Sequence, residues 1–329
     1  MAEHPGTSAP ARAFFEKVDR QGTSLRAYGE SRSGDVVFSQ GDPSLPLALT
    51  GITQVFLLAM VLRDIDRGAI SRDTPISDVL PSTYAHGLCV VKGSDYTGSI
   101  TVGQLLAGSS GIPDFFDPPA KGIRPLRAQL EETDRSWSLP EAIELARHYP
   151  GVFVPGTRKG HHSTTNQILM GELLHETTGM GLPALLELRV TKALGLNSTY
   201  FFSHEHHNTF FTLAPIQYKE TIVHIPRALS SLGAAGGIVS TPRETVRFLH
   251  ALRTGAVFHS DWWGAIQADP TSFGFSPSGR AKSLVTVSGI SGVSAGFDTR
   301  SHHAAVVATN QWGGAESAST YLRTALGLV

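Results

Sequence analysis

The sequence predicts an α/β fold in which a single sheet, built from both ends of the chain, carries a helical insertion. Strand-like runs lie within 24–39, near the N-terminus, and within 283–309, near the C-terminus. Between about 70 and 230 the chain is richer in proline and in short helical patterns. Hydrophobic residues make up 41% and charged residues 17% of the 329 positions, a balance typical of globular domains with a substantial core.

Turn and breaker residues define the first elements. Residues 33–35 (Ser-Gly-Asp) form a turn signal that separates two strands within 24–39. From 53 to about 67 the sequence is dense in apolar residues and contains neither Gly nor Pro, and Gly68 follows, so we expect a buried helix there. Its longest apolar run, 55–62, is too short for a membrane span, which needs about 20 residues.

Capping signals define the later helices. Ser138 precedes Leu-Pro-Glu as an N-cap does, which predicts a helix over 138–148. A helix over 165–178 is expected to end at Gly179, a typical C-cap residue. Further short elements are expected at 101–107 (helix), at 283–288, 296–299 and 304–309 (strands) and at about 315–326 (a closing helix).

Charge and cysteine content exclude several classes of partner. Lys plus Arg number 27 and Asp plus Glu number 28, so the chain lacks the basic field that nucleic-acid binding requires. Cys89 is the single cysteine, so neither an internal disulfide nor a Cys-rich metal site can form. The polar N-terminal segment 1–20 lacks the pattern of a secretory signal, and we expect a cytoplasmic protein without membrane segments.

A series of short segments, in a fixed order along the chain, carries a family resemblance. They are 51–54 (GITQ), 73–81 (DTPISDVLP), 100–106 with 110–112, 155–157 (PGT), 162–171, 194–201, 234–241 and 290–297. In this order they resemble landmarks of the serine β-lactamases, the penicillin-binding proteins and their esterase relatives, especially the class C branch. The resemblance implies an αβα sandwich around a mainly antiparallel sheet (1–70 and 232–329), a mainly helical lobe (71–231) and an active-site-like cleft between them.

The resemblance also implies a catalytic serine and lysine, which this chain lacks. In that superfamily the motif S-x-x-K starts a helix, and its spacing puts the hydroxyl and the amine on one helical face. The landmarks put Gly51 at the serine position and Gln54 at the lysine position, and S-x-x-K occurs nowhere in the chain. Because loss of the nucleophile alone costs roughly 10⁶ in the turnover of a serine hydrolase, we expect no acyl-enzyme chemistry of the family type.

The other family motifs are replaced as well. His162 stands where the family has a proton-shuttling tyrosine, and Thr164 stands where it has an asparagine two residues later. Ile290 takes the place of the Lys or His of the last active-site strand, whereas Ser291 and Gly292 are retained. Histidine side chains exchange protons near neutral pH, so His162 is a candidate general acid or base. The alternative is that it only fills the space of the tyrosine and forms hydrogen bonds.

Polar residues at the aligned positions are candidates for substrate contacts, each with a structural alternative. Gln54 can orient a carbonyl or a hydroxyl group, or it can bond to nearby backbone. Thr164 and Ser291 carry hydroxyl groups that have the same two interpretations. Gly51 lies in the same implied cleft and offers no side chain to a substrate.

Aromatic residues and a second histidine complete the set of candidates. Phe115 and Phe116 follow a landmark whose loops rim the family's cleft, so they either form an apolar wall for the ligand or pack into the core. Trp312 has the same two interpretations. His161 is expected to point away from His162, because neighbouring side chains alternate on an extended segment.

A histidine-rich segment offers no convincing metal site. His204 and His206 would share one face of a strand, and imidazole groups bind zinc. No third ligand with telling spacing is visible, so a solvated loop is the preferred interpretation and neither a metal nor a cofactor is expected.

These observations leave three hypotheses for function. The preferred one is a repurposed, non-hydrolytic enzyme that cyclises, isomerises or eliminates a small carbonyl-containing metabolite by acid–base catalysis through His162. The second is a catalytically inactive relative that binds a ligand or a protein. The third is an esterase or acyltransferase with an unrecognised nucleophile. The sequence does not indicate an oligomeric state.

Overall fold

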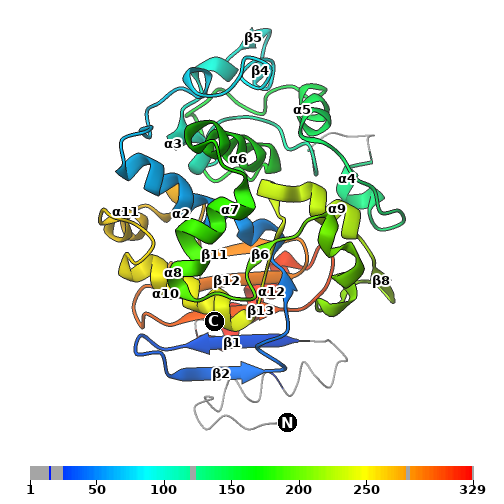
Figure 1. Cartoon of the computed structure of the whole chain (residues 1–329), viewed down its shortest axis with the longest axis vertical. Helices are drawn as coiled ribbons and strands as arrows, with labels where there is room; N and C mark the ends of the chain where they lie inside the picture. The colour runs from blue at the N-terminus through cyan, green and yellow to red at the C-terminus, as the bar shows by residue number, and fades with distance from the viewer. Residues whose placement is uncertain (1–14, 16–24, 119–123, 279–281, 328–329) are drawn as a thin grey trace.

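The main sheet joins the two ends of the chain. A computed structural model describes residues 15, 25–118, 124–278 and 282–327 (Figure 1). Its main sheet has the strand order β10–β11–β12–β13–β1–β2, with antiparallel neighbours throughout. These strands are β1 (Arg26–Glu30), β2 (Val36–Gln40), β10 (Ser276–Ser278), β11 (Leu284–Gly289), β12 (Val293–Asp298) and β13 (Ala304–Ala308). Residues 1–20, which were expected to hold no secretory signal, lie outside the described residues except for Phe15.

Helices of very different lengths account for most of the remaining structure. They are α2 (Thr53–Asp66), α3 (Val102–Leu106), α4 (Leu126–Gln129), α5 (Leu139–Arg147), α6 (Thr164–Thr178), α7 (Leu182–Leu186), α8 (Lys192–Leu194), α9 (Pro226–Leu232), α10 (Pro242–Thr254), α11 (Trp262–Ala268) and α12 (Ala315–Ala325). The smaller strands are β3 (Leu47–Ala48), β4 (Val90–Val91), β5 (Ser94–Asp95), β6 (Tyr200–Phe201), β7 (Ile216–Tyr218), β8 (Thr221–Val223) and β9 (Ile238–Ser240).

Helices cover both faces of the main sheet. Neighbouring residues of β13 point to opposite faces, as the period of a strand requires. Val307 packs in one buried cluster with Leu322 of α12, whereas Val306 belongs to the other cluster, which holds Phe248 of α10. Phe248 in turn stacks on Phe56 of α2, with ring centroids 3.8 Å apart. The predicted αβα sandwich around a mainly antiparallel sheet is therefore confirmed.

The predicted helix ends match the observed ones because they depend on local chemistry. Ser138 forms a reciprocal capping box with Glu141 at the start of α5. Helix α6 ends at Gly179, which adopts a left-handed conformation with φ 66°. Helix α2 ends at Asp66, and its C-cap Arg67 directly precedes Gly68, where the helix was predicted to stop.

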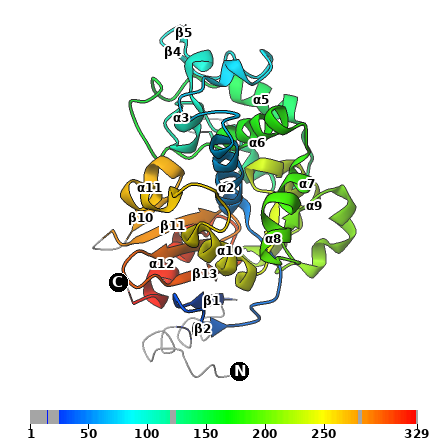
Figure 2. The same cartoon turned by 60° about the vertical axis from the view of Figure 1, so that its left-hand side comes forward.

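A mainly helical lobe lies at the opposite end of the molecule from β1 and β2. Helices α3, α5 and α6 gather there, together with the hairpin β4–β5 (Figures 1 and 2). A small sheet of order β3–β9–β6 takes strands from both parts of the chain. The exact division at 70/71 and 231/232 stays a prediction.

A buried ion pair holds the helix that leads into the candidate site. Asp64 of α2 is fully buried, and its Oδ1 lies 2.5 Å from the guanidinium of Arg189. Arg189 also donates to the carbonyl oxygen of Met60, and Thr177 of α6 donates to Asp64. These bonds connect α2 to α6 and to the helical turn at Glu187–Thr191.

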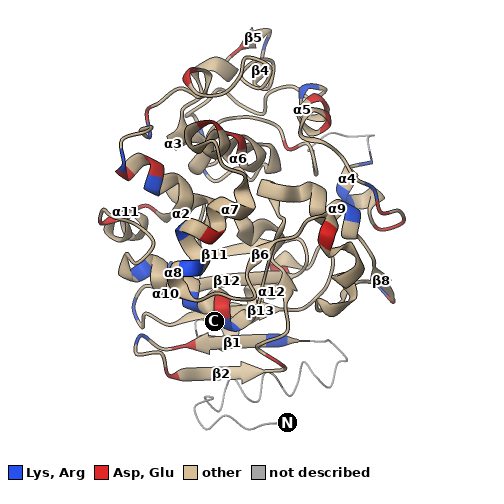
Figure 3. Cartoon of the chain, in the orientation of Figure 1, with Lys and Arg blue, Asp and Glu red and all other residues tan. Residues whose placement is uncertain are grey.

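Charged residues are spread over many elements. Lys and Arg segments are interspersed with Asp and Glu segments in the view of Figure 3. Among the described residues, no helix combines the length and the apolar character that crossing a membrane requires.

Candidate functional site

The position expected for a nucleophile lies where α2 meets the end of β11. Gly51 is the middle residue of a short helical turn, η1 (Thr50–Ile52), directly before α2. A Cβ atom added to Gly51 would stand 2.5 Å from the carbonyl oxygen of Ser288 and 3.3 Å from the Cα of Gly289. Backbone of β11 therefore occupies the space that a side chain at position 51 would need.

The turn after β11 corrects one sequence expectation. Strand β11 ends at Gly289, so Ile290 lies in the following turn, and the expectation that it stands on the last active-site strand is wrong. Ser288 and Gly289 are the strand residues beside Gly51. The strand itself was predicted at 283–288, close to its observed range, so only the assignment of Ile290 to it was misplaced.

Ser291 binds the turn to the start of α2. Ser291 is 2% exposed. Its hydroxyl donates to the carbonyl oxygen of Ala48 at 2.6 Å and lies 3.0 Å from the Oγ1 of Thr50. Thr50 has a positive φ of 44°, an uncommon conformation for a threonine. Ser291 thus supports η1 from behind and is not among the residues that line the two cavities described next.

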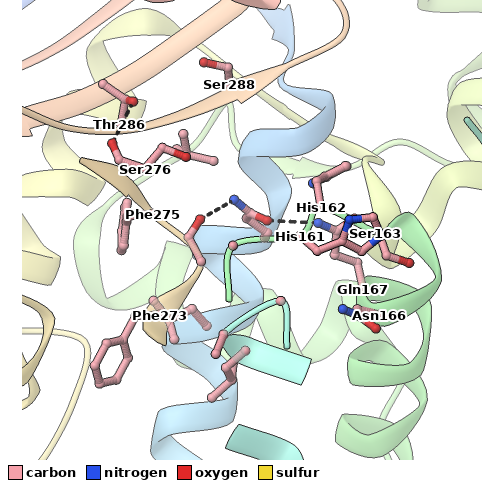
Figure 4. Close-up of a pocket in the computed structure, with 18 of the residues that line it drawn as sticks. His161, His162, Ser163, Asn166, Gln167, Phe273, Phe275, Ser276, Thr286 and Ser288 are labelled. Atoms are coloured by element: carbon pink, nitrogen blue, oxygen red, sulfur yellow. Dashed lines mark hydrogen bonds between the residues drawn. The ribbon is translucent and has the colours of Figure 1, made fainter. Parts of the chain in front are cut away.

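A cavity of about 390 Å³ lies along α2 and α6, and we call it the glutamine cavity because Gln54 and Gln167 line it. Its other walls come from the end of α3, the segment 160–163, the segment 273–276, β11 and α12. Figure 4 shows labelled residues from the segment 160–163, α6, the segment 273–276 and β11 around one space. Leu58, Met170 and Phe275 give the wall an apolar character, whereas Arg323 and Glu316 of α12 contribute charges.

A hydrogen-bonded chain of amides crosses this cavity. Gln54 Nε2 donates to the carbonyl oxygen of Gly274 at 2.8 Å, and Gln167 Nε2 donates to Gln54 Oε1 at 2.9 Å (Figure 4). Gln167 is 3% exposed, and its Oε1 is buried without a hydrogen-bond partner. Gln54, at the position expected for a lysine, therefore connects α6 to the segment after α11.

A second cavity, of about 540 Å³, lies on the other side of the same wall. We call it the aspartate cavity because Asp114 and Asp117 line it, together with Thr50, Gly51 and Arg127 among others. His162, Ser288 and Ala315 line both cavities, so they form the boundary between the two.

The polar wall of the aspartate cavity is arranged around one buried carboxylate. Asp114 accepts hydrogen bonds from the hydroxyl of Thr164 and from the backbone N–H groups of Phe116 (2.8 Å) and Asp117 (3.3 Å). Arg127 pairs with Asp117, with Nε 2.9 Å from Oδ2. Thr164 thus lines the cavity with its hydroxyl already engaged.

The three aromatic candidates have different surroundings. Phe116 lines the aspartate cavity. Phe115 is 2% exposed, stands edge-on to Trp137 at 6.2 Å and lines neither cavity. Trp312 is 5% exposed, and its backbone N–H donates to the carbonyl oxygen of Gln217. Trp312 lines neither of these two cavities, so Phe116 is the one of the three that lines either of them.

Both neighbouring histidines line the glutamine cavity. The segment before α6 is irregular, so the alternation expected for an extended segment does not apply to His161 and His162. His162 is exposed, and no hydrogen bond to its side chain is found among the described residues. His161 is half-buried, and its Nε2 has no partner. Burial lowers the pKa of His161, an effect that nearby Asp114 partly opposes.

A serine lies beside a lysine elsewhere in the fold, a pair that no sequence motif indicates. Lys159 Nζ lies 2.9 Å from Ser272 Oγ and 2.8 Å from Asp269 Oδ2, and Ser272 donates to the same carboxylate at 2.6 Å. These bonds lower the pKa of Asp269, which stays ionised beside the ammonium group. The amine is thus already engaged by a carboxylate, and Ser272 lines neither cavity.

The histidine-rich segment forms a short helix. His204 and His206 lie on the 3₁₀ helix His204–Thr212, where His206 Nδ1 accepts from Ser203 and its ring stacks on Tyr200 at 4.6 Å. Within the described ranges, no three His, Cys, Asp or Glu side chains gather in a way that could hold a metal ion.

Comparison with known proteins gives consistent matches over nearly the whole chain. The family model described as Beta-lactamase matches residues 43–328. The esterase EstB of Burkholderia gladioli is 23% identical over 333 residues, which cover 94% of this chain and 79% of that protein.

Solved structures give the same picture at the level of the fold. A D-stereospecific amidohydrolase from Streptomyces sp. is similar with a TM-score of 0.76 at 20% identity, covering 96% of this chain and 97% of that one. EstCE1, a hydrolase with promiscuous acyltransferase activity, has a TM-score of 0.74 at 14% identity, covering 96% and 97%. At these identities, the likeness establishes the architecture around the two cavities and leaves their chemistry to the residues themselves.

Proposed function

This chain belongs to the beta-lactamase family, and we propose that it is an enzyme that acts on a small carbonyl compound by acid–base catalysis, without a covalent serine ester. The predicted resemblance to the serine β-lactamases and penicillin-binding proteins is confirmed by the family match and by the solved structures. The relatives named above include an esterase, an amidohydrolase and a hydrolase with acyltransferase activity, so carbonyl compounds are the substrate class that the family suggests.

The observation that carries the proposal is the closed position at Gly51. The Ser288 carbonyl oxygen stands 2.5 Å from the site of a Cβ atom, so an attacking side chain has neither atoms nor space there. Gln54 adds a second argument, because both ends of its amide are engaged in hydrogen bonds and an amide is no base near neutral pH. Acylation by the family's route is therefore disfavoured at both of its positions.

His162 is the side chain best placed for proton transfer. It is exposed and lines both cavities, and within the described part of the chain no hydrogen bond holds its ring nitrogens away from a substrate. An imidazole within about 2.6–3.2 Å of a substrate atom can take a proton on one nitrogen and return it at another carbon or oxygen. Enolisation followed by isomerisation, ring closure or elimination needs such transfers and correct positioning, and no covalent intermediate.

The test uses the mass of the product. We would incubate the purified protein with fractionated small-molecule extracts and with a panel of hydroxy, keto and amido compounds, and follow conversion by liquid chromatography and mass spectrometry. Isomerisation or cyclisation leaves the mass unchanged and elimination of a hydroxyl group removes one water, whereas hydrolysis splits an acyclic ester or amide into two products whose summed mass is that of the substrate plus one water. We expect products of the first two kinds, and a pair of hydrolysis fragments, or a ring-opened product one water heavier, would argue against the proposal.

Variants of two histidines assign the proton transfer. We expect His162→Ala to lower the rate about 10²–10⁴-fold, the usual contribution of a general acid or base. His175→Ala is the matched control, since His175 is also exposed and belongs to α6 but lines neither cavity. Unchanged turnover in His162→Ala would refute the assigned role. If no compound is converted while a ligand still raises the melting temperature, the chain is a binding protein.

A second candidate function, hydrolysis through Ser272, is favoured by one specific observation. Its hydroxyl lies 2.9 Å from Lys159 Nζ, a serine–lysine pair like those that generate nucleophiles. The ion pair of Lys159 with Asp269 opposes this function, because it engages the amine that would have to take the proton of the hydroxyl group. Intact-mass measurement after treatment with a fluorophosphonate distinguishes the two: a single adduct that disappears in Ser272→Ala would replace the acid–base proposal with this one.

A further inference from the structure

We propose that the aspartate cavity binds the ammonium group of an amine-bearing ligand, and that Oδ2 of Asp114 accepts the hydrogen bond from that group. The inference rests on the proposed function only in placing the substrate beside His162. It deepens that function by assigning a substrate class, namely small carbonyl compounds that carry a protonated amine, in preference to those with a hydroxyl group in its place.

One oxygen of Asp114 carries all of its hydrogen bonds. The hydroxyl of Thr164 and the backbone N–H groups of Phe116 and Asp117 all donate to Oδ1, and no group of the described residues donates to Oδ2. Oδ2 is also not among the described side-chain atoms that are fully enclosed without a partner. Because Asp114 lines the cavity, this second oxygen keeps a surface that a ligand can reach.

The charge of Asp114 has no cationic partner in the described part of the chain. Asp114 is 5% exposed, and a carboxylate at such depth is normally paired. Arg127 is the one Lys or Arg among the described residues that line the cavity. Its guanidinium pairs with Asp117 and lies 3.6 Å from Glu131, so two other carboxylates already share it. The cavity therefore favours a ligand that brings a positive charge of its own.

An organic ammonium group suits this acceptor better than a metal ion does. A zinc or calcium ion needs several ligands that converge on one point, and within the described ranges no three His, Cys, Asp or Glu side chains do so. An ammonium group is a compact donor that a single carboxylate oxygen can bind. Phe116, Leu232 and Ile290 line the same cavity of about 540 Å³ and can contact the hydrocarbon part of such a ligand.

The proposed amine site lies close to the proposed general acid or base. Thr164, whose hydroxyl donates to Asp114, follows His162 by two positions. Their Cα atoms are therefore at most about 7 Å apart. His162 also lines the aspartate cavity. A ligand held at Asp114 by its ammonium group thus places atoms a few bonds from its nitrogen near the imidazole, which is where an amine-bearing substrate would carry its carbonyl group.

The experiment compares two probes that differ in a single group. Benzylamine and benzyl alcohol have the same number of heavy atoms and nearly the same shape, but only benzylamine is cationic at neutral pH. We would measure their dissociation constants for the full chain by calorimetry in sodium phosphate, a buffer without a competing amine. We expect benzylamine to bind at least about tenfold more tightly, the effect of one charge-assisted hydrogen bond.

Three variants test the origin of this preference. Asp114→Asn keeps the shape of the side chain and removes its charge, so it is expected to reduce the preference to within about threefold. Asp73→Asn is the matched control, because Asp73 is exposed and lines neither cavity, and it should keep the full preference. Ile290→Lys brings an ammonium group of the chain to the wall of the aspartate cavity, where it competes with the amine of the ligand. This variant should also reduce the preference to within about threefold, and it decides the question if Asp114→Asn fails to fold.

Two results would overturn the inference. One is equal affinity of both probes, or no saturable binding of benzylamine, in the unmodified chain. The other is a preference that survives in folded Asp114→Asn protein or, where that variant does not fold, in Ile290→Lys. None of these measurements depends on turnover, so a failure of His162→Ala to change the rate would refute the proposed catalysis and leave the amine site standing.

Discussion

Adding a single methyl group at position 51 is the most direct test of the closed nucleophile position. Gly51→Ala introduces only the Cβ atom, and Gly51 does not have a positive φ, so the backbone conformation itself accepts alanine. The new atom would stand 2.5 Å from Ser288 O and 3.3 Å from Gly289 Cα. Both neighbours are backbone atoms of a strand that is paired with β10 and β12, so neither can move independently.

The expected cost follows from this geometry. Ordinary contacts of a Cβ atom begin near 3.4 Å, so β11 or η1 must shift by roughly 1 Å, and such overpacking typically costs about 1–3 kcal/mol. At about 2–4 °C for each kcal/mol in a large domain, the melting temperature should fall by about 2–12 °C. Gly51→Ser carries the same atom and should be destabilised at least as much.

Scanning calorimetry of the variants decides the matter, with Gly264→Ala as the control. Gly264 lies inside α11, and an added Cβ atom there would meet nothing closer than Asp261 Oδ2 at 3.6 Å. That substitution should leave the melting temperature unchanged or raise it, since alanine favours a helix. A Gly51→Ala protein as stable as the unmodified chain would mean that the space is open, and the main argument against acylation would be lost.

Three further predictions concern stability and reactivity. Arg189→Met should lower the free energy of unfolding in urea by about 3–5 kcal/mol because it leaves the carboxylate of Asp64 buried without its partner, whereas Arg67→Met, at an exposed pair with the same carboxylate, should cost less than about 1 kcal/mol. Burial lowers the pKa of His161, so as the pH falls the unfolded chain takes up a proton on this residue at a higher pH than the folded chain does. The contribution of His161 to the free energy of unfolding is therefore full above its ordinary pKa near 6.5 and decreases below it. His161→Gln should flatten that part of the curve of stability against pH. Burial raises the pKa of Cys89 to about 11, so a thiol reagent at pH 8 should label the unfolded chain and spare the folded one; equal labelling of both would contradict the structure.

Local signals explain which parts of the fold were predictable from the sequence. The turn at 33–35, the cap at Ser138 and the terminator Gly179 act within a few residues, and each matches an observed boundary. Helix α10 carries equally local signals that the sequence predictions omit: Thr241 accepts from Glu244 N as an N-cap, and Pro242 follows it.

Apart from Phe116, which follows a landmark loop, the predicted residues that line a cavity stand at positions of a family motif. His162 and Gln54 were found in this way, and both line the glutamine cavity. Gln167 was not, because an isolated glutamine inside a helix gives no signal until its partner is known, and that partner is 113 positions away. Lys159 and Ser272 are likewise 113 positions apart, and only folding brings them together.

The two substitutions at the start of α2 are physically consistent with each other. A lysine at position 54 could keep the bond to Gly274 O, but its ammonium group would also face the N–H donors of Gln167 and could accept nothing from them. With a glycine at position 51 there is no hydroxyl for such an amine to activate, and β11 fills the space. The neutral amide of Gln54 satisfies both of its neighbours, so the same position that supplies a base in the superfamily here fixes the orientation of Gln167. The loss of the base and the new amide link between α2, α6 and the segment after α11 thus depend on the same side chain.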